Sequence, residues 1–412
     1  MNQRNHRPET GENVPGLAPR RAALRLMDAV LRRGETLDNA AHPATQGLSQ
    51  PDKALARALA GEAMRWMVDL DALIDSATRQ VLPDDAKPRA VLRLMLAGWL
   101  RLETPPHAVV ATGLELLQGG PRRLAHGVFS ALVKQGVTLP ETPTLPAGAA
   151  GRWGERGAAI AAGLAVPPPL DLTVKAGKDA PEGLSLMPGH VRLSRGDAVE
   201  SLPGFAAGDW WVQDLAASLP ARLIGAGAGR VLDVCAAPGG KTMQLAAAGW
   251  DVTALDNSAK RIERMRANLE RTGLSADLVA TNALKYEPEA LFDAVLLDAP
   301  CTATGTCRRH PDVLHRIGAR QIAEMAELQQ ALLERAAGWL KPGGVLVYAV
   351  CSLEREEGEE QAAKVTLTPD PIRAEELPPG VAPTAEGWLR TDPGMLGEAG
   401  GLDGFFVARW RK

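Results

Sequence analysis

The sequence predicts an α/β protein in which an all-α N-terminal bundle is followed by a Rossmann-like domain. Apolar residues recur at helical spacing through roughly the first 137 positions. After residue 210, strand-like apolar runs alternate with helical segments, which is typical of a parallel sheet covered by helices on both faces. With 412 residues the chain is also too long for one ordinary core, so two or three domains are expected.

The first part of the chain carries the helical pattern. Residues 1–17 are polar, contain Pro and Gly, and are expected to be disordered. The segments that follow have apolar residues at i, i+3 and i+4 and end at Gly or Pro. They are PRRAALRLMDAVLRRGETLDNA, KALARALAGEAMRWMVDLDALIDSATRQV, KPRAVLRLMLAGWLRLE, HAVVATGLELLQ and RRLAHGVFSALVKQG. Together they predict a helical domain over residues 18–138.

The composition changes at GVTLPETPTLPAGAAG, which is rich in Pro, Thr and Gly and suits an exposed linker. A short helix is expected near GERGAAIAAGL, and LTVKAG and HVRLS have the character of strands. Residues 139–208 are therefore expected to form a linker and a small α/β subdomain.

Residues 209–412 carry the alternating pattern. The expected strands are RVLDVCA, DVTALD, ADLVAT, FDAVLLDAP and GGVLVYAVCS, and the expected helices are GKTMQLAAAG, SAKRIERMRANLERTG and AEMAELQQALLERAAGWL. The final GFFVARW is apolar enough to add a closing strand. Ligands of such sheets bind beyond the carboxyl ends of the strands, so chemistry is expected there.

The composition excludes several classes of protein. With 45% apolar and 23% charged residues, the chain is expected to be globular rather than disordered or fibrous. No apolar run approaches the roughly 20 residues of a membrane helix, and the opening lacks a signal-peptide core, so a cytoplasmic protein is expected. The four cysteines form no CxxC pair and no His/Cys ligand spacing, which predicts reduced thiols and no metal site.

The overall charge of −3 does not argue against a nucleic-acid partner. Residues 1–140 contain 18 Lys and Arg against 14 Asp and Glu, a net charge of +4. Much of the acidity lies later, in runs such as LEREEGEEQ after Cys351. A local basic face is therefore compatible with the composition.

The turn DVCAAPGGKT follows the first strand of the α/β pattern. The turn is not a P-loop, because that motif has a further glycine ahead of its Gly-Lys pair. This chain has Cys235 and Ala236 in the corresponding place. It is not GxGxxG either. What remains is a Gly-rich turn between strand and helix that lets a ligand approach backbone amides.

Polar residues end the next three strands. Asp256 can hold both ribose hydroxyls, Asn282 can accept a hydrogen bond from an adenine amino group, and Asp298 ends the fourth strand. Adenosine fits this arrangement. The alternative is structural: Gly239 and Gly240 serve the turn's φ angles, and Asp256 caps the next helix. The combination of these residues favours a ligand site.

Two cysteines also stand at strand ends. Cys301 follows DAP, and Cys351 follows LVYAV at another strand end, so the two can be neighbours in one parallel sheet. A buried cysteine is usually a small apolar residue, and this interpretation suits Cys235 and above all Cys307. Positive charge from Arg308, Arg309 and His310 would favour thiolate or hold phosphates, although HPD also suits a simple turn that caps a helix.

The chemistry of thiols narrows the function. Enzymes that methylate amino groups commonly end this strand in Asn or Asp, Pro, Pro and an aromatic residue, whereas this chain has DAPC. Carbon 5 of a pyrimidine becomes nucleophilic only after a thiolate adds at carbon 6. One cysteine suffices for this attack, a second can assist proton removal or release, and Asp298 can stabilise the base edge. The residues alone do not decide which thiol attacks.

The motifs DVCAAPGGKT, LLDAPCTATGTCRRHPD, YAVCS and DGFF resemble those of the RNA cytosine-5 methyltransferases of the Sun type. LPGF and WWVQDLAAS resemble the segment that leads into this family's core. The helical start, with PPHAVVATGLEL and HGVFSALVKQ, resembles NusB-like RNA-binding domains. The resemblance covers nearly the whole chain. It implies a NusB-like domain followed by an S-adenosylmethionine-dependent methyltransferase domain.

The resemblance also implies roles for residues. Cys351 would be the nucleophile, Cys301 would assist product release, and Asp298 would line the base and cofactor pocket. Their positive charge, apart from the resemblance, makes Arg308 and Arg309 the expected RNA contacts. S-adenosylmethionine would be bound by Asp256, Asn282, Asp298 and the turn residues Cys235, Ala236, Ala237, Pro238, Gly239, Gly240 and Lys241. The implied substrate is a cytosine of 16S ribosomal RNA, methylated by a monomer.

Two positions depart from the family pattern. Asn282 replaces the usual aspartate, which bears on the adenine contact, and Cys307 stands where an apolar residue is more common. DNA cytosine-5 methyltransferases share the chemistry but use a Pro-Cys thiol, and the NusB-like domain favours structured RNA. The remaining alternatives are a transfer-RNA methyltransferase with the same core and a non-catalytic RNA-binding factor.

Overall fold

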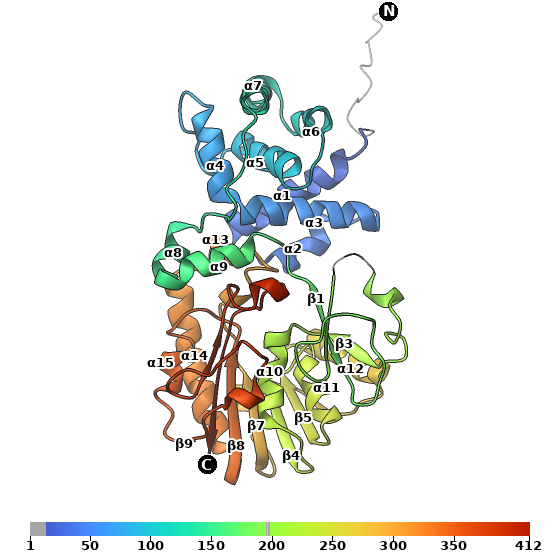
Figure 1. Ribbon diagram of the computed structural model, residues 1–412, viewed down its shortest axis with the longest axis vertical. Coiled ribbons are helices and arrows are strands. Elements are labelled where there is room, and N and C mark those ends of the chain that lie inside the picture. The colour runs from blue at the N-terminus through green and yellow to red at the C-terminus, as the bar shows by residue number, and fades with distance from the viewer. Residues whose placement is uncertain (1–13, 195, 197) are drawn as a thin grey trace, which may run out of the picture. The chain divides into compact units, whose positions relative to one another are not determined.

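The computed structural model describes residues 14–412 except 195 and 197. The chain forms two compact units, coloured along the sequence in Figure 1. The helical unit comprises the chain up to Ala150 together with His310–Arg316, and the sheet unit comprises Gly151–Arg309 and Ile317–Lys412. The disorder predicted for residues 1–17 falls mostly on residues 1–13, which lie outside the described residues. Helix begins at Leu17.

The helical unit confirms the predicted NusB-like bundle. Its helices are α1 (Leu17–Arg33), α2 (Leu37–Ala44), α3 (Gln50–Arg65), α4 (Met67–Ser76), α5 (Lys87–Leu100), α6 (Pro106–Gly113) and α7 (Gly119–Gln135). Thr36 and Ser49 cap α2 and α3 by accepting from the amides of Asn39 and Asp52. Gly34 ends α1 in the left-handed conformation. Gly34 and Thr36 divide the first long predicted segment into α1 and α2, and the second long segment is divided at Trp66, where α3 ends and α4 begins.

The helical unit includes a short segment from much later in the chain. His310–Arg316 ends in helix α13 (Val313–Arg316), which the sequence did not assign to this unit. The Asp312 carboxylate accepts from the Leu37 amide at 3.3 Å, and His315 Nε2 lies 2.7 Å from the Met64 carbonyl oxygen. Burial lowers the pKa of His315, so its neutral ring donates to that carbonyl.

The sheet unit begins with α8 (Ala147–Trp153), whose later part belongs to it, and α9 (Gly157–Leu164). A three-stranded antiparallel sheet follows, in the order β2 (His190–Leu193), β1 (Leu170–Val174) and β3 (Trp210–Val212). The division between the two compact units falls after Ala150, so the small sheet lies in the same unit as the main sheet. Its strands β1 and β2 come from the predicted segment 139–208, and β3 comes from the segment that follows.

The main sheet has eight strands, with β10-β11-β8-β7-β4-β5-β6 in order and β9 beside β11. Strands β8, β7, β4, β5 and β6 run parallel, and β11 is antiparallel to β8. The predicted closing strand is thus confirmed, and the sheet is mixed at that edge. The bounds are β4 (Arg230–Val234), β5 (Asp251–Asp256), β6 (Asp277–Ala280), β7 (Phe292–Asp298), β8 (Leu340–Val350), β9 (Thr368–Pro369), β10 (Leu389–Thr391) and β11 (Phe405–Arg411).

Helices cover both faces of this sheet. Successive side chains of a strand point to opposite faces, and the strands carry apolar residues on both. On one face, Val295 and Leu297 of β7 pack with Leu332 of α14 (Ala319–Gly338) and with Trp339, the residue that follows this helix. On the other face, Leu296 packs with residues of α10 (Leu215–Ile224) and α11 (Gly240–Ala247). Helix α12 (Ala259–Thr272) packs beside α11. No helix in the described part of the chain is long and apolar enough to cross a membrane.

Candidate active site

The candidate site lies at the carboxyl ends of the central parallel strands. The chain leaves β4 through the glycine-rich turn and α11 toward β5 on one side, while β7 and β8 lie on the other side of β4. Open α/β sheets bind their ligands outside the strand ends at such a reversal of direction. Asp298 ends β7 and is level with Ala349 of β8, so the residues that follow both strands are neighbours.

The turn after β4 has the backbone that glycine permits. Gly239 has a φ of 103°, and a Cβ there would lie 2.6 Å from Met265 Cγ. Helix α11 starts at the next residue, Gly240. The structural explanation of Gly239 therefore holds, and it is compatible with a ligand site because the same turn places the start of a helix at these strand ends.

Asp256 ends β5 and is buried. One carboxylate oxygen accepts from the Ala237 amide at 3.2 Å, and the other accepts from the Ser258 amide at 2.9 Å. Arg261 forms an ion pair with it at 2.9 Å. Ser258, rather than Asp256, caps α12. Asp256 thus joins the β4 turn to the end of β5, at the position expected for a ribose contact.

Asn282 lies just after β6 and is exposed. Its side-chain oxygen accepts from the Leu284 amide at 2.9 Å and so caps the short helix Ala283–Lys285. The amide group predicted to meet adenine therefore already has a local partner. A second lone pair of the same oxygen remains chemically able to accept another bond.

Lys241, which is buried, and Asp298, which is partly exposed, form an ion pair that spacing along the chain did not reveal. Lys241 Nζ lies 2.7 Å from Asp298 Oδ2 and 5.5 Å from the centre of the Phe405 ring. Burial acts to lower the pKa of Lys241, but the charge and hydrogen bond of Asp298 raise it above its usual value. Lys241 therefore stays a cation, and the Asp298 carboxylate has a fixed positive partner at the site.

The structure brings the two strand-end thiols together. Cys301 Sγ lies 3.4 Å from Cys351 Sγ. The hydrogen bond with Cys351, then burial, and then the charges of Cys351 and Glu357 raise the pKa of Cys301 well above its usual value. Cys301 is therefore held as a neutral thiol beside its partner.

The segments that carry the thiols are bonded to each other along their length. The Gly305 amide donates to the Cys351 carbonyl at 3.0 Å, and the Leu353 amide donates to Thr304 Oγ1 at 3.0 Å. A Cβ on Gly305 would lie 1.9 Å from the Gly404 carbonyl oxygen, so only glycine fits there. The DGFF segment thus packs directly against the loop that follows Cys301.

The other two cysteines have different surroundings. Burial, and then the charges of Asp298 and Asp256, raise the pKa of Cys235 to about 12, so it stays protonated within the glycine-rich turn. Cys307 is fully buried. Neither is placed to act as a thiolate, in keeping with the packing role considered for both.

Arg308 is buried, whereas Arg309 is about a quarter exposed, and both form ion pairs. Arg308 is 1% exposed and pairs with Asp403 at 3.2 Å, while Arg309 pairs with Asp214 at 2.7 Å and Asp403 at 2.9 Å. Burial and the nearby Asp214 raise the pKa of Asp403 to about 6. Both guanidinium groups thus already have carboxylate partners, and their contact with RNA phosphates stays a prediction.

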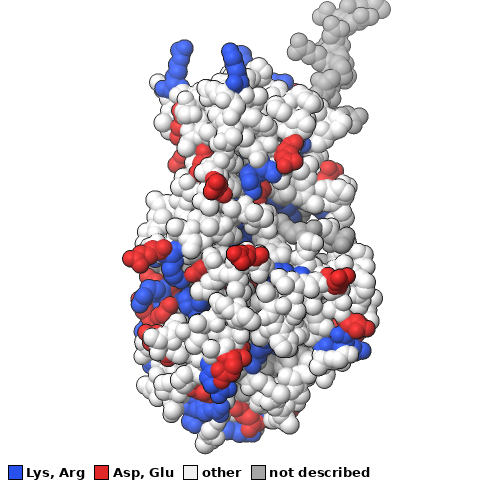
Figure 2. Space-filling model, viewed as in Figure 1, with Lys and Arg blue, Asp and Glu red and all other residues white. Residues whose placement is uncertain are grey.

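Exposed basic residues occur on α7. Arg123 and Lys134 are exposed, Arg122 pairs with Glu115, and the helix contains no Asp or Glu. Figure 2 shows Lys and Arg side chains projecting at the end of the helical unit near α7. This helix is a further candidate for contact with a polyanion, because its exposed cations have no acidic neighbours within the helix.

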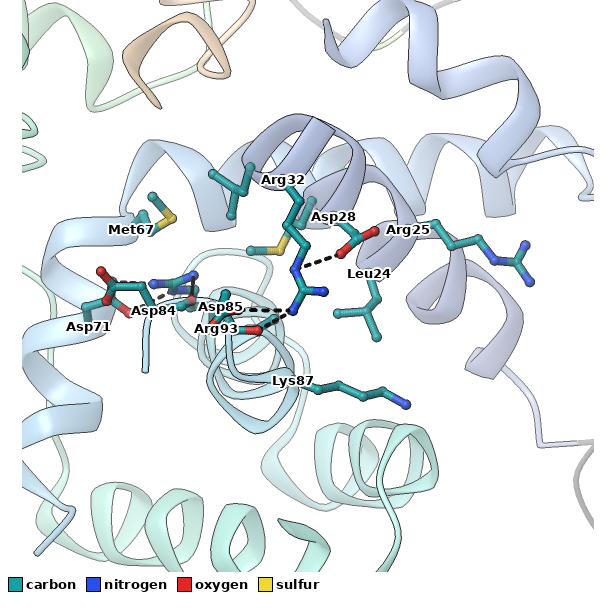
Figure 3. Close-up of a pocket in the computed structure, with 13 residues that line it drawn as sticks. Leu24, Arg25, Asp28, Arg32, Met67, Asp71, Asp84, Asp85, Lys87 and Arg93 are labelled. Atoms are coloured by element: carbon teal, nitrogen blue, oxygen red, sulfur yellow. Dashed lines mark hydrogen bonds and ion pairs between the residues drawn. The ribbon is translucent and has the colours of Figure 1, made fainter. Parts of the chain in front are cut away.

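A cavity of about 520 Å³ in the helical unit is not a candidate active site. Figure 3 shows two of its lining cations engaged with acids: Arg32 bonds to Asp28 at 3.2 Å, and Arg93 bonds to Asp71 at 2.7 Å. Its lining contains no cysteine or histidine. No group of His, Cys, Asp and Glu that could hold a metal was found within residues 14–412, leaving out 195 and 197.

A sheet of this order, with a glycine-rich turn leading out of its central strand, defines an S-adenosylmethionine-dependent methyltransferase fold. The crystal structure of PH0851 has the same fold, with a TM-score of 0.71, 21% identity, and coverage of 98% of this chain and 100% of that one. A methyltransferase homolog protein from Pyrococcus horikoshii matches with a TM-score of 0.53 and 28% identity, over 64% of this chain and 93% of that one.

The chain belongs to the 16S rRNA methyltransferase RsmB/F family. The sequence profile of that family matches residues 225–411, and the profile of the NusB family matches residues 17–121. The ribosomal RNA small subunit methyltransferase B of Klebsiella pneumoniae subsp. pneumoniae is 33% identical over 429 residues, covering 95% of this chain and 97% of the relative. That of Salmonella typhi is 32% identical over 435 residues, with the same coverage.

Proposed function

We propose that this protein methylates carbon 5 of a cytosine in 16S ribosomal RNA through a covalent bond between a cysteine and carbon 6. The observation that carries the proposal is the 3.4 Å approach of Cys301 Sγ and Cys351 Sγ at the ends of neighbouring strands. Methylation of an amino group has no use for a thiol pair, whereas methylation of carbon 5 requires one thiolate to attack carbon 6 and benefits from a second thiol.

Cys351 is the proposed nucleophile. Its thiolate forms the S–C6 bond, which makes carbon 5 electron-rich and able to take up a methyl group. A proton then leaves carbon 5, and the S–C6 bond breaks as the double bond is restored. Cys301 is proposed to assist that release, because its raised pKa keeps a proton on sulfur beside Cys351. Lys241 supplies positive charge near the Cys351 thiolate, and Asp298 is proposed to bind the base edge.

S-adenosylmethionine is the proposed cofactor, and when bound it supplies an electrophilic sulfonium methyl group. The donor set fits it, because Asp256 and Asp298 put negative charge at the strand ends and a carboxylate accepts from two ribose hydroxyls. The proposed contacts are Asp256 with ribose, Asn282 with adenine, Asp298 with the pocket, and the turn residues Cys235, Ala236, Ala237, Pro238, Gly239, Gly240 and Lys241 with the remainder.

The proposed substrate follows from the family and from the NusB domain. The relatives are named as small-subunit ribosomal RNA methyltransferases, and the helical unit offers the basic helix α7. A target base in structured RNA must leave its stack to reach a pocket at the strand ends. We place the reaction in the cytoplasm, carried out by a monomer.

The test is methylation by the purified protein of 16S ribosomal RNA and of bulk transfer RNA, followed by bisulfite sequencing. A single 5-methylcytosine in 16S RNA is expected, and the same site should lose its mark in a deletion strain. Methylation confined to transfer RNA would show that transfer RNA, and not 16S ribosomal RNA, is the substrate. RNA binding without any methyl transfer would point to a non-catalytic factor.

A further inference from the structure

Glu357 is a buried carboxylate that lies six residues after Cys351, in the acidic run LEREEGEE. Its exposed fraction is 0%, whereas its neighbour Glu356 is exposed. A carboxylate leaves water at a cost of several kcal/mol unless its oxygens find donors inside the protein. Its position therefore requires a set of bonding partners.

These partners are the residues that directly follow the two thiols. One oxygen of Glu357 accepts from Ser352 Oγ at 2.7 Å and from Thr302 Oγ1. The other accepts from the Thr302 amide at 2.9 Å and from Gln329 Nε2 at 2.9 Å. One carboxylate thus bonds the neighbour of Cys301 and the neighbour of Cys351.

The same network holds Cys301 from its other side. Gln329 Nε2 in α14 also donates to the carbonyl oxygen of Pro300, at 2.8 Å. Glu357 is itself anchored through its backbone, because Tyr348 in β8 donates its hydroxyl to the Glu357 carbonyl at 2.6 Å. Cys301 therefore sits between two residues whose positions depend on the Gln329–Glu357 pair.

We propose that Glu357 is a positioning residue that sets the separation and direction of the Cys301 and Cys351 thiols. The proposal rests on the proposed function, in which one sulfur attacks and the other assists release. Bonds from neutral donors to a charged carboxylate are stronger than those between neutral groups. Such bonds suit a pair of sulfur atoms that must be held to within about 0.5 Å for reaction.

The deciding variant is Glu357→Gln, which keeps the side chain's size. The amide of glutamine has one acceptor oxygen and one NH₂ group. The NH₂ group would meet two of the four donors that bond Glu357, so the amide cannot accept all four bonds. We expect kcat for methyl transfer to fall about 100-fold, the scale of a misplacement near 1 Å, while the Kd for S-adenosylmethionine changes less than about threefold. The matched control is Glu356→Gln, which should leave both values unchanged.

A second measurement reports the thiol geometry without methyl transfer. Diamide oxidises two adjacent thiols to a disulfide and is itself reduced to the hydrazine, taking up both protons and both electrons. We expect a Cys301–Cys351 disulfide, identified by peptide mass spectrometry, to form at least about tenfold more slowly in Glu357→Gln than in the wild type. Glu356→Gln should match the wild type.

The outcomes separate this proposal from the proposed function. If the wild type methylates no cytosine, the proposed function fails, yet the diamide comparison still tests Glu357. Unchanged kcat and unchanged disulfide formation in Glu357→Gln would overturn the positioning role. So would a matching loss of cofactor affinity, because that indicates general damage to the fold. If Glu357→Gln does not fold, Ser352→Ala takes its place, because it removes one of the donors to Glu357. Ser352→Ala should slow methyl transfer and disulfide formation by a smaller factor.

Discussion

At the scale of single residues, the two thiols are distinguished by their surroundings. Cys301 has a pKa well above the usual value, whereas Cys351 lies in the electrostatic reach of the Lys241 ammonium. We expect Cys351→Ala to abolish methylation and form no covalent complex. Cys301→Ala should still attack but release slowly, so covalent protein–RNA complexes should accumulate. Denaturing gels and mass spectrometry measure both, and a complex trapped only in Cys351→Ala would reverse the two roles.

Asp233 offers a pH-dependent test beside the glycine-rich turn. Its carboxyl is fully buried and accepts from Thr242 Oγ1 at 2.6 Å. Burial raises the pKa of Asp233 from 3.8 to about 7. The fold therefore favours the protonated carboxyl. Its contribution to the free energy of unfolding is complete below about pH 4 and is lost as the pH rises through about 7.

We expect Asp233→Asn, which stays neutral and can still accept from Thr242, to stabilise the protein at pH 8 and not at pH 4. The difference in the free energy of unfolding is at most about 4 kcal/mol. Calorimetric melting temperatures of both proteins at the two pH values measure it. Asp251→Asn at an exposed position is the control. A melting-temperature shift of the same size at both pH values would contradict the buried-charge explanation.

Some residues of the site were predictable from the sequence and others were not. Cys301, Cys351, Asp256 and Asp298 follow apolar strands, and strand ends of one parallel sheet meet at one edge. The role of Glu357 was hidden, because a run such as LEREEGEE normally faces water and its donors come from elsewhere in the chain. The carboxylate partner of Arg308 and Arg309 was hidden for the same reason, since Asp403, about 95 residues away, pairs with both.

At the scale of elements, periodicity located the long helices and the parallel strands. It did not find β9 or β10, because strands of two and three residues are too short to show alternation. It also ran α3 and α4 together, since Trp66 ends α3 without a Gly or Pro nearby. Periodicity could not predict the order of the strands either, because the pairing of β7 with both β4 and β8 depends on contacts between distant segments.

Helix α7 provides a prediction at this scale. Replacing Arg123 and Lys134 with Ala removes two exposed cations from a helix without acidic residues. We expect RNA affinity to fall about tenfold at moderate salt, and the slope of log K against log[salt] to flatten by up to about 2. Filter binding at several salt concentrations measures this. Arg320→Ala, an exposed cation on α14, is the control. An unchanged slope would exclude α7 from the RNA interface.

At the scale of the whole molecule, the chain enters the helical unit twice. His310–Arg316 belongs to it, with Val313 and Leu314 buried, although the residues on either side belong to the sheet unit. No pattern in HPDVLHR distinguishes it from a surface turn, so the sequence could not predict this membership. The segment follows directly on the loop that carries Cys301.

Removing residues 1–150 should therefore damage more than RNA binding. Leu37 and Met64 would be lost, and with them the bonding partners of Asp312 and His315. We expect the fragment 151–412 to melt at a lower temperature than the full chain and to aggregate, and Val313→Ser with Leu314→Ser in the fragment should relieve the aggregation. Light scattering and calorimetry measure these effects. A fragment as stable as the full chain would show that the segment needs no helical partner.

The double entry of the chain also limits how this protein can be recombined. A methyltransferase sheet cannot be given a different RNA-binding module by exchanging the first 150 residues alone, because seven residues from the middle of its sequence complete the old module. A working chimera would have to replace His310–Arg316 as well. The two units therefore alternate along the chain, and no single cut in the sequence separates one from the other.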